Sequence, residues 1–167
     1  LDGASAVTVK GADGKTQKLD AAKILLATGV VSRAMPGLPF NGKTVIGSRE
    51  AMVLEHQPKS IVIIGAGAIG VEFAYFFDAF GTKVTLVEMM PNILPLEDTE
   101  VSQALEKSFA KQGINVLTSA KVVKAEANPN GVKITVEGKK NETLEAEICL
   151  LAIGVQPLRL GNGTAKP

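Results

Sequence analysis

Residues 60–88 switch between two hydrophobic patterns, and this restricts the fold more than any other feature of the chain. Ile61–Ile64 is a continuous β-branched run, which is typical of a strand buried on both faces of a parallel sheet. Apolar residues then recur at helical spacing as far as Gly81, which predicts an amphipathic helix with one inner face. The expected inner face consists of Ile69, Phe73, Phe76, Phe77 and Phe80. Lys83–Glu88 returns to a strand pattern, so the segment predicts a right-handed βαβ unit.

The junction between the first strand and the helix reads Gly65-Ala66-Gly67-Ala68-Ile69-Gly70 and fits the pattern G-x-G-x-x-G. The first glycine permits a tight turn, the second has no Cβ to keep a diphosphate away, and the third allows close packing of helix on strand. Unpaired N–H groups at the helix start then bind the diphosphate without a basic side chain. The alternative interpretation is that the glycines only form a tight junction between strand and helix. The surrounding βαβ pattern favours dinucleotide binding.

An acidic residue, Glu88, ends the second strand of the unit. A carboxylate there accepts hydrogen bonds from the ribose hydroxyls of adenosine and repels a 2′-phosphate. Residues 89–92 contain no arginine to bind such a phosphate, so we expect NAD rather than NADP. The alternative interpretation is that Glu88 is only a solvent-exposed residue at the end of a strand. Glu72 has two possible interpretations, a functional role or simple stabilisation by the helix dipole, and the sequence favours neither.

The composition makes several function classes unexpected. Eighteen Lys+Arg against seventeen Asp+Glu leave a net charge of +1, and aromatic residues make up 4% of the chain, so we expect no nucleic-acid partner. The single cysteine and single histidine exclude a redox cysteine pair and a Cys/His zinc site, so no metal is expected. Cys149 lies in an apolar strand and is expected in the core. His56 has no nearby acidic or nucleophilic partner, and we expect no catalytic residue in this chain.

The same sequence shows no feature that would direct the chain to a membrane. The longest charge-free apolar run, residues 61–71, is too short to cross a bilayer, and the first residues lack the pattern of a secretory signal. We therefore expect no membrane partner and a cytoplasmic location. The chain begins with Leu1 rather than Met, which suggests a processed chain or an excised fragment.

The N-terminal region predicts a hairpin and a buried strand. Residues alternate from Ala6, the pair Asp13–Gly14 predicts a turn, and Ile24–Ala27 has the apolar run of a buried strand. The proline- and glycine-containing residues 30–59 are expected to connect two domains.

The C-terminal half predicts a second helix followed by short strands. The helix spans 99–112, with Asp98 or Thr99 as its cap, Gly113 as its end, and an inner face of Val101, Leu105 and Phe109. Residues 114–117 predict a strand. From Val122 onward three short strands are expected, with turns at 130–131 and 139–141, the last strand ending at 150–154.

An internal repeat links the two ends of the chain. A shift of 125 positions (144 − 19) aligns Leu19–Gly29 with Leu144–Gly154, and six of the eleven pairs are identical. Val7 and Val9 also match Val132 and Ile134. Two apolar strands that end at glycine can resemble each other by chance. We favour duplication, with two related dinucleotide-binding domains of which the first is present only as its tail.

These motifs resemble the pyridine nucleotide-disulfide oxidoreductases. The resemblance extends to about Pro157 and rests on Ile24–Gly29, Ile61–Glu72, Val84–Glu88 and Leu150–Gly154. Pro91–Pro95 and the helix that follows resemble in particular the members that oxidise dihydrolipoamide. The resemblance implies an α/β, Rossmann-like FAD/NAD(P)-binding fold, in which a parallel sheet with helices carries an antiparallel β-meander.

The same resemblance implies a domain division. Residues 1–37 would be the C-terminal part of an incomplete half of the FAD-binding domain, and 38–59 would be a connector. Residues 60–156 would be the NAD-binding domain, and 157–167 a tail or linker.

The resemblance also assigns the site residues. The glycine turn and the start of the helix would bind the diphosphate and the nicotinamide side of NAD. Glu88 would bind the adenosine ribose, Val122 would lie near the adenine, and Gly154 near the nicotinamide. In the intact parent protein, Thr28 and Gly29 would contact FAD. The implied NAD-binding residues are Gly65, Ala66, Gly67, Ala68, Ile69, Gly70, Val71, Glu72, Glu88, Val122 and Gly154.

The family's FAD-binding glycine motif, its cysteine pair and its His-Glu pair all fall outside this sequence. In the intact parent a reduced dithiol passes electrons to FAD, and the flavin passes a hydride to NAD. We therefore expect the chain by itself to be inactive. The resemblance implies a homodimeric parent whose partners are NAD/NADH and a 2-oxo acid dehydrogenase complex carrying dihydrolipoyl groups. Two alternatives stay open: another flavoprotein, such as an NADH oxidase or a mercuric or glutathione reductase, and a non-catalytic NAD-sensing module.

Overall fold

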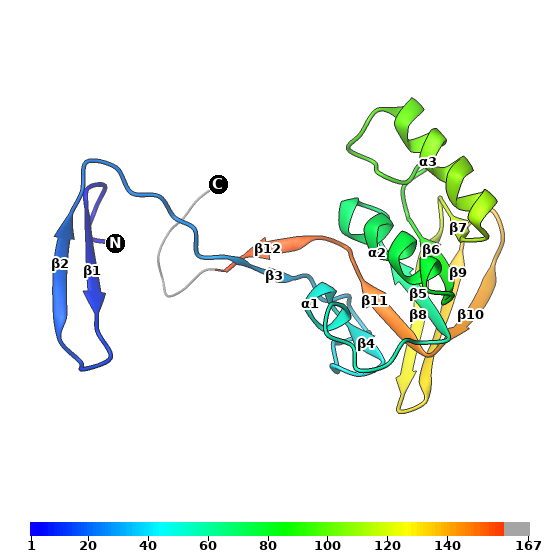
Figure 1. Ribbon diagram of the computed structural model, residues 1–167, viewed down its shortest axis with the longest axis horizontal. Helices are drawn as coiled ribbons and strands as arrows, with labels where there is room; N and C mark the ends of the chain where they lie inside the picture. Colours follow the sequence, from blue (N-terminus) through cyan, green and yellow to red (C-terminus); the bar gives the residue numbers. More distant parts are fainter. Residues whose placement is uncertain (159–167) are drawn as a thin grey trace. The chain divides into compact units, whose positions relative to one another are not determined.

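The computed structural model describes residues 1–158 and divides the chain into two compact units (Figure 1). Within the described residues, the smaller unit consists of Leu1–Val31 and residues 156–158, and the larger unit is Ser32–Val155. The tail expected at 157–167 falls almost wholly outside the described residues. No helix within residues 1–158 is long and apolar enough to span a bilayer.

The larger unit is built on a five-stranded sheet with the order β4-β11-β5-β6-β7. Each neighbouring pair of strands in it is parallel. The strands are β4 (Val45–Ile46), β11 (Ile148–Leu151), β5 (Ser60–Ile64), β6 (Lys83–Val87) and β7 (Asn115–Leu117). The expected βαβ unit is therefore confirmed, and β4, from the segment expected as a connector, belongs to the same sheet.

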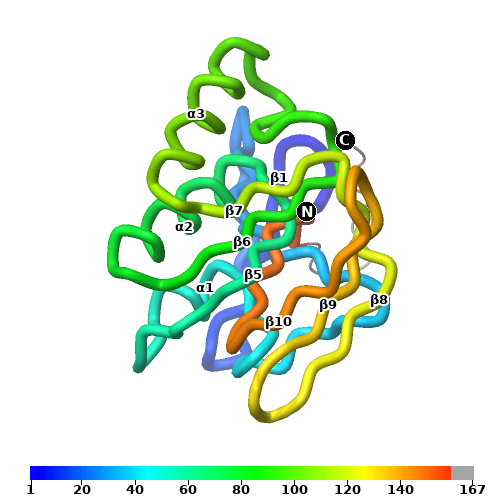
Figure 2. Tube along the Cα trace, turned by 90° about the vertical axis from the view of Figure 1, so that its right-hand side faces the viewer, coloured from blue at the N-terminus to red at the C-terminus, as the bar shows by residue number. Residues whose placement is uncertain are grey.

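Helices cover one face of this sheet and an antiparallel meander covers the other (Figure 2). The helices are α1 (Ser48–Ala51), α2 (Ala68–Ala79) and α3 (Thr99–Gln112), and the meander strands are β8 (Lys121–Asn128), β9 (Gly131–Glu137) and β10 (Glu142–Ala146). Side chains alternate along a strand, so β5 contributes to two cores. Ile61 and Ile63 pack with the helices, whereas Val62 and Ile64 pack with the meander. The parallel sheet with an antiparallel meander is confirmed.

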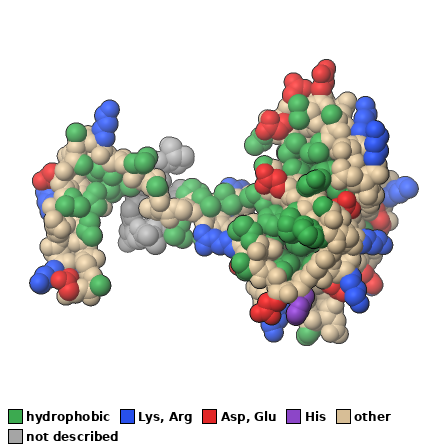
Figure 3. All heavy atoms as spheres, in the orientation of Figure 1, with side chains coloured by type: hydrophobic (Ala, Val, Ile, Leu, Met, Phe, Trp, Pro, Cys, Tyr) green, Lys and Arg blue, Asp and Glu red, His purple; other side chains and the backbone are tan. Residues whose placement is uncertain are grey.

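Helix α2 ends where the sequence predicts, but its inner face differs from the expected one. Gly81 has a φ of +85° just after the helix, and the Thr82 N–H donates to the Phe77 carbonyl at 3.0 Å. Phe77 is buried as expected, but Phe76 and Phe80 are 49% and 63% exposed. The residues that α2 buries are Gly70, Val71, Ala74 and Phe77. These mostly small residues let the helix approach the sheet closely, so Phe76 and Phe80 lie on the side of the helix toward solvent. Figure 3 shows apolar side chains on the surface of this unit.

Helix α3 has the caps that the sequence predicts. The Asp98 side chain accepts a hydrogen bond from the Glu100 N–H at 2.9 Å, and Gly113 ends the helix with a φ of +97°. The expected inner face is wrong at one position, because Val101 is 52% exposed. Ser102 is buried in its place, since its hydroxyl donates to the Ile93 carbonyl at 2.6 Å.

The expected third strand of the meander is two strands in two sheets. β10 pairs with β9, and β11 lies in the parallel sheet. The break falls at Glu147, whose carboxylate accepts from the Lys59 N–H at 2.8 Å. All four residues of Ile148–Leu151 are buried. Such a run needs a sheet that is covered on both faces, which the meander cannot provide.

The position of β11 between β4 and β5 also explains the burial of Cys149, which was expected and whose side chain has no exposed surface. Burial raises the pKa of the Cys149 thiol from 9.0 to about 12. The unfolded chain therefore loses the thiol proton at a lower pH than the folded chain. The stabilisation is complete below pH 9 and is lost as the pH rises toward 12.

We expect the free energy of unfolding to fall by roughly 1 kcal/mol for each pH unit above 9 because of this thiol. Urea denaturation of the parent chain and of Cys149→Ala across that range measures the contribution. In the variant, the free energy of unfolding should fall less steeply with pH, because the thiol is absent. Equal slopes in the two proteins would contradict the assignment.

The smaller unit contains the expected hairpin of β1 (Ala6–Lys10) and β2 (Thr16–Asp20). Gly14 in its turn has a φ of +78°. The strand expected at Ile24–Ala27 is wrong for this chain, because these residues form no strand and Leu25 is 91% exposed. Within the described residues, β1 and β2 pair only with each other, so a buried strand has no neighbour to pair with.

The repeat in the sequence has a counterpart in the backbone. Gly29 and Gly154, which the repeat aligns, have φ values of +86° and +102°. The strands that follow them, β3 (Val30–Ser32) and β12 (Val155–Pro157), pair with each other. The Arg33 N–H donates to Gly154 at 3.0 Å, and the Leu158 N–H donates to Gly29 at 2.9 Å. Both bonds belong to one antiparallel ladder, and any such ladder pairs its residues in this way, so duplication stays a prediction.

Candidate functional site

A cleft of about 730 Å³ opens at the carboxyl ends of β5, β6 and β11. In open α/β sheets this edge is where ligands bind. The lining is mainly apolar, with one acidic and one basic side chain. The residues that line it are Met35, Pro36, Ile64, Gly65, Gly67, Ala68, Ile69, Val87, Glu88, Met89, Pro95, Ala120, Lys121, Val122, Ala152, Ile153 and Gly154.

The three glycines of the turn have different surroundings. Gly65 has a φ of +99°, and a Cβ there would lie 2.5 Å from the Ala152 carbonyl oxygen. A Cβ on Gly70 would lie 1.9 Å from the Gly65 carbonyl oxygen. A Cβ on Gly67 would meet no atom within 4 Å. Packing therefore explains the first and third glycines, whereas the open space at Gly67 belongs to the cleft.

The start of α2 supplies hydrogen-bond donors to this open space. Gly67 is the N-cap of the helix, and no side chain caps it. The first turn contains no acidic residue that would compete with an anion. The first N–H groups of a helix have no acceptor within the helix, and the helix dipole adds partial positive charge there. This end of α2 is therefore suited to bind a diphosphate.

The Glu88 carboxylate is held by two backbone N–H groups, one of which belongs to the turn. The side chain is 8% exposed, and its Oε2 accepts from the Ala66 N–H at 2.7 Å. Its Oε1 accepts from the Met90 N–H at 2.8 Å. A carboxylate oxygen can accept more than one hydrogen bond, so both oxygens keep capacity for hydroxyl groups of a ligand. Glu88 lines the cleft rather than turning away from it.

The cleft brings together seven of the residues predicted to bind NAD: Gly65, Gly67, Ala68, Ile69, Glu88, Val122 and Gly154. Ala66, Gly70 and Val71 are buried behind the turn, and they support it without lining the cleft. Glu72 is exposed, does not line the cleft and lies beyond the first turn of α2, so the helix dipole gives it little stabilisation. Its functional role stays a prediction.

The remaining candidates lie elsewhere. Thr28 and Gly29 belong to the smaller unit, where the Thr28 hydroxyl donates to the Leu158 carbonyl at 3.1 Å. Their contact with FAD stays a prediction. His56 is exposed.

Several residues of the cleft carried no signal in the sequence. Lys121 adds a positive charge beside Val122, although the sequence suggested binding without a basic side chain. Met35 and Pro36 reach the cleft from the segment before β4, and Met89 and Pro95 reach it from the loop between β6 and α3. Single lysine, methionine and proline residues have no spacing that marks a site, so only the fold shows that they line the cleft.

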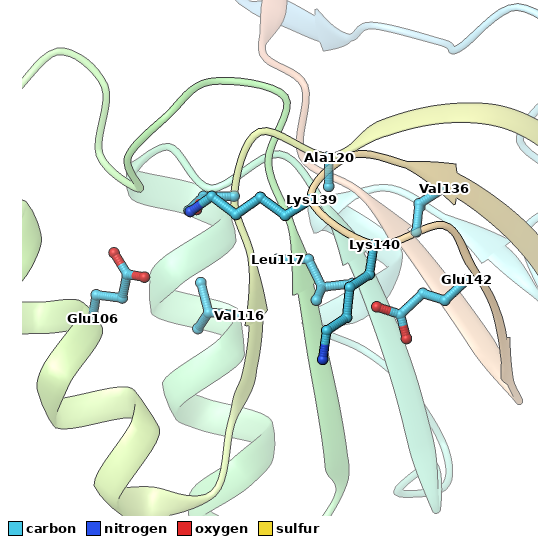
Figure 4. Close-up of a pocket in the computed structure, with 9 residues that line it drawn as sticks. Glu106, Val116, Leu117, Ala120, Val136, Lys139, Lys140 and Glu142 are labelled. Carbon is cyan, nitrogen blue, oxygen red and sulfur yellow. The ribbon is translucent and has the colours of Figure 1, made fainter.

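A second, smaller pocket of about 260 Å³ shares Ala120 with the cleft (Figure 4). Lysines from the turn between β9 and β10 line it together with Glu106 of α3 and Glu142 of β10. Its charges are balanced, and no glycine turn or uncapped helix start lines it. The larger cleft is therefore the candidate site.

Comparison with known protein families shows which family the chain belongs to. Residues 1–165 match the family described as pyridine nucleotide-disulphide oxidoreductase. The chain belongs to this family. The resemblance drawn from the glycine turn and the neighbouring strands is thereby confirmed at the level of the family.

Individual relatives agree with this membership. The dihydrolipoyl dehydrogenase of Chlorobaculum tepidum is 46% identical over 93% of this chain and 34% of its own length. The dihydrolipoamide dehydrogenase of Chaetomium thermophilum is 43% identical over 96% of this chain and 32% of its own. The chain thus spans about a third of the length of these curated relatives.

Solved structures show the same fold. The crystal structure of LpdA from Mycobacterium tuberculosis matches with a TM-score of 0.80 and 28% identity, covering 98% of this chain and 36% of that one. The HOCl-induced flavoprotein disulfide reductase RclA from Escherichia coli matches with a TM-score of 0.69 and 29% identity, covering 92% and 34%.

Proposed function

We propose that residues 60–156, with β4 and α1 of the same compact unit, form the NAD-binding domain of a dihydrolipoyl dehydrogenase. The observation that carries the proposal is the open space at Gly67 beside the fixed Glu88 carboxylate in one cleft. The names of the relatives at 43–46% identity support the choice of enzyme.

The described residues fit each part of NAD. The uncapped start of α2 at Gly67 and Ala68 would bind the diphosphate, and the Glu88 carboxylate would accept the hydroxyls of the adenosine ribose. Val122 would contact the adenine, and Gly154 at the other wall would lie near the nicotinamide. When bound, NAD supplies the acceptor for a hydride. The part played by this chain is to hold and orient the dinucleotide and to exclude water from the apolar wall.

We propose that the intact parent protein also holds FAD, with contacts from Thr28 and Gly29, and oxidises dihydrolipoyl groups carried by a 2-oxo acid dehydrogenase complex. A homodimeric parent and a cytoplasmic location stay predictions. The chain alone should be inactive, because the flavin motif and the redox cysteine pair expected of the family lie outside this sequence. The main alternative is a different flavoprotein disulfide reductase, which the similarity to RclA keeps open. The cysteine spacing in the parent protein discriminates between the two.

Titration of the chain with NADH and NADPH tests the proposed cofactor. We expect NADH to bind about tenfold more tightly, a difference of about 1.4 kcal/mol, because the Glu88 carboxylate repels a 2′-phosphate. Glu88→Gln should weaken NADH binding and remove the preference, because an amide supplies only one acceptor oxygen to two backbone N–H groups.

Glu106→Gln in the second pocket is the matched control, and it should change neither affinity. Equal affinities for the two nucleotides in the parent chain, or tighter binding of NADPH, would contradict the role assigned to Glu88.

A further inference from the structure

We propose that Leu94 is a positioning residue for the dinucleotide-binding turn, acting through its backbone N–H and its left-handed conformation. The inference deepens the proposed function and rests on it. Leu94 lies in the loop Met89–Glu97, which follows β6 and precedes α3 and is called the strap below (Figure 1). The sequence marks Pro91–Pro95 only as part of the family resemblance and gives Leu94 no role of its own.

Ala66 lies between the first two glycines of the turn and is held on both sides by hydrogen bonds. Its N–H donates to the Glu88 carboxylate at 2.7 Å. Its carbonyl accepts from the Leu94 N–H, also at 2.7 Å. Ala66 is fully buried, so water cannot replace either partner. Both sides of Ala66 are therefore held, and this fixes the orientation of the adjoining Gly67 N–H at the start of α2.

Leu94 holds this bond from an unusual backbone conformation. Its φ is +47°, and it is one of two residues other than glycine with a positive φ in the described chain. A non-glycine residue adopts this region only when its surroundings impose it. The side chain of Leu94 is only partly buried, so packing alone does not require the conformation.

The strap is anchored to α3 through both peptide groups of Leu94. Ile93 is fully buried, and its carbonyl accepts from the Ser102 hydroxyl at 2.6 Å. The same hydroxyl lies 3.3 Å from the Leu94 carbonyl, which also accepts from the Glu97 N–H at 2.9 Å. The first bond holds the peptide group that contains the Leu94 N–H, and the other two hold the carbonyl of Leu94. A continuous set of hydrogen bonds thus runs from α3 through the strap to the turn that meets the diphosphate.

The test compares two substitutions at Leu94 in the full chain. Valine keeps an apolar side chain, but its branched Cβ disfavours a positive φ. Asparagine loses the apolar contact, but it tolerates the left-handed conformation and keeps the N–H in place. A residue that only fills space would show the opposite order of effects, because valine preserves packing better than asparagine.

The ligands are ADP-ribose, which contains the diphosphate, and adenosine, which lacks it, with binding followed by NMR titration. We expect Leu94→Val to weaken ADP-ribose binding about fivefold or more and to leave adenosine binding unchanged within about twofold. Leu94→Asn should keep the affinity for ADP-ribose. Ser102→Ala, which removes the anchor on α3, should act in the same direction as Leu94→Val. Glu88→Gln should weaken both ligands, since both contain the ribose.

Each contrary result has a separate meaning. A parent chain that binds ADP-ribose, together with a Leu94→Val variant that binds it equally well, would overturn the positioning role alone. Weaker binding of ADP-ribose by asparagine than by valine would overturn it in favour of simple packing. Loss of both ligands in Leu94→Val would show a general loss of structure and would also overturn it. Absence of ADP-ribose binding by the parent chain would overturn the proposed function itself.

Discussion

Gly70→Ala is expected to lower the free energy of unfolding of the Ser32–Val155 unit by about 3 kcal/mol or more, the upper part of the range for overpacked sites. The added Cβ would lie 1.9 Å from the Gly65 carbonyl oxygen and 3.6 Å from the Ala152 Cβ. The first contact is with backbone, so no flexible side chain can move aside. Relief requires that α2 moves away from β5, which would open the core on that face of the sheet. Urea denaturation followed by circular dichroism measures the change.

Gly67→Ala is the matched control for this prediction. It adds the same methyl group three residues earlier, in a space with no atom within 4 Å. Its φ of −72° suits alanine, so only the loss of glycine at an N-cap remains, a cost of a few tenths of a kcal/mol or slightly more. Equal destabilisation by the two substitutions would show that the packing of α2 on β5 is not as close as described.

The same Gly67→Ala substitution is expected to have the largest effect on binding. The methyl group would occupy the space beside the start of α2 where the diphosphate is proposed to lie. We expect the affinity for NADH to fall at least about tenfold, or 1.4 kcal/mol, while the midpoint of unfolding changes little. Isothermal titration calorimetry measures the affinity. An unchanged affinity would mean that the dinucleotide, if bound, does not approach the turn at Gly67.

The βαβ unit was predictable because its signals are local. A β-branched run, a glycine turn and a helical period follow one another between Ser60 and Val87, and each element agrees with its neighbours. The caps of α3 at Asp98 and Gly113 were predictable for the same reason. Capping depends on the residues at the helix end and little on the rest of the fold.

The predictions from the sequence are wrong where the pairing of strands or the packing of a helix on the sheet decides the structure. Ile24–Ala27 has the composition of a buried strand, but no neighbouring strand in the described chain pairs with it. The run after Glu142 reads as one strand, yet Leu144 and Cys149 belong to different sheets because only the parallel sheet is covered on both faces. The face of α2 was misjudged at Phe76 and Phe80, because spacing does not reveal that small residues bring the helix close to the sheet.

Some residues of the candidate site can likewise be predicted from the sequence, and others are revealed only by the fold. Gly65, Gly67 and Glu88 were predictable because the chemistry of a diphosphate and a ribose requires these residue types at this spacing. The sequence does not indicate that Lys121 and the strap line the cleft, since they reach it through the fold. The positive φ of Leu94 has no signal in a leucine side chain.

Backbone amide NMR during titration of the full chain with NADH tests the central claim most directly, because the ligand is proposed to bind backbone N–H groups. We expect the largest shifts at Gly67, Ala68 and Ile69, with further shifts at Ala66 and Met90, whose N–H groups are bonded to Glu88. The second pocket, at Thr118 and Lys139, should change little. Shifts concentrated in that pocket, or an unchanged spectrum at saturating NADH, would contradict the account.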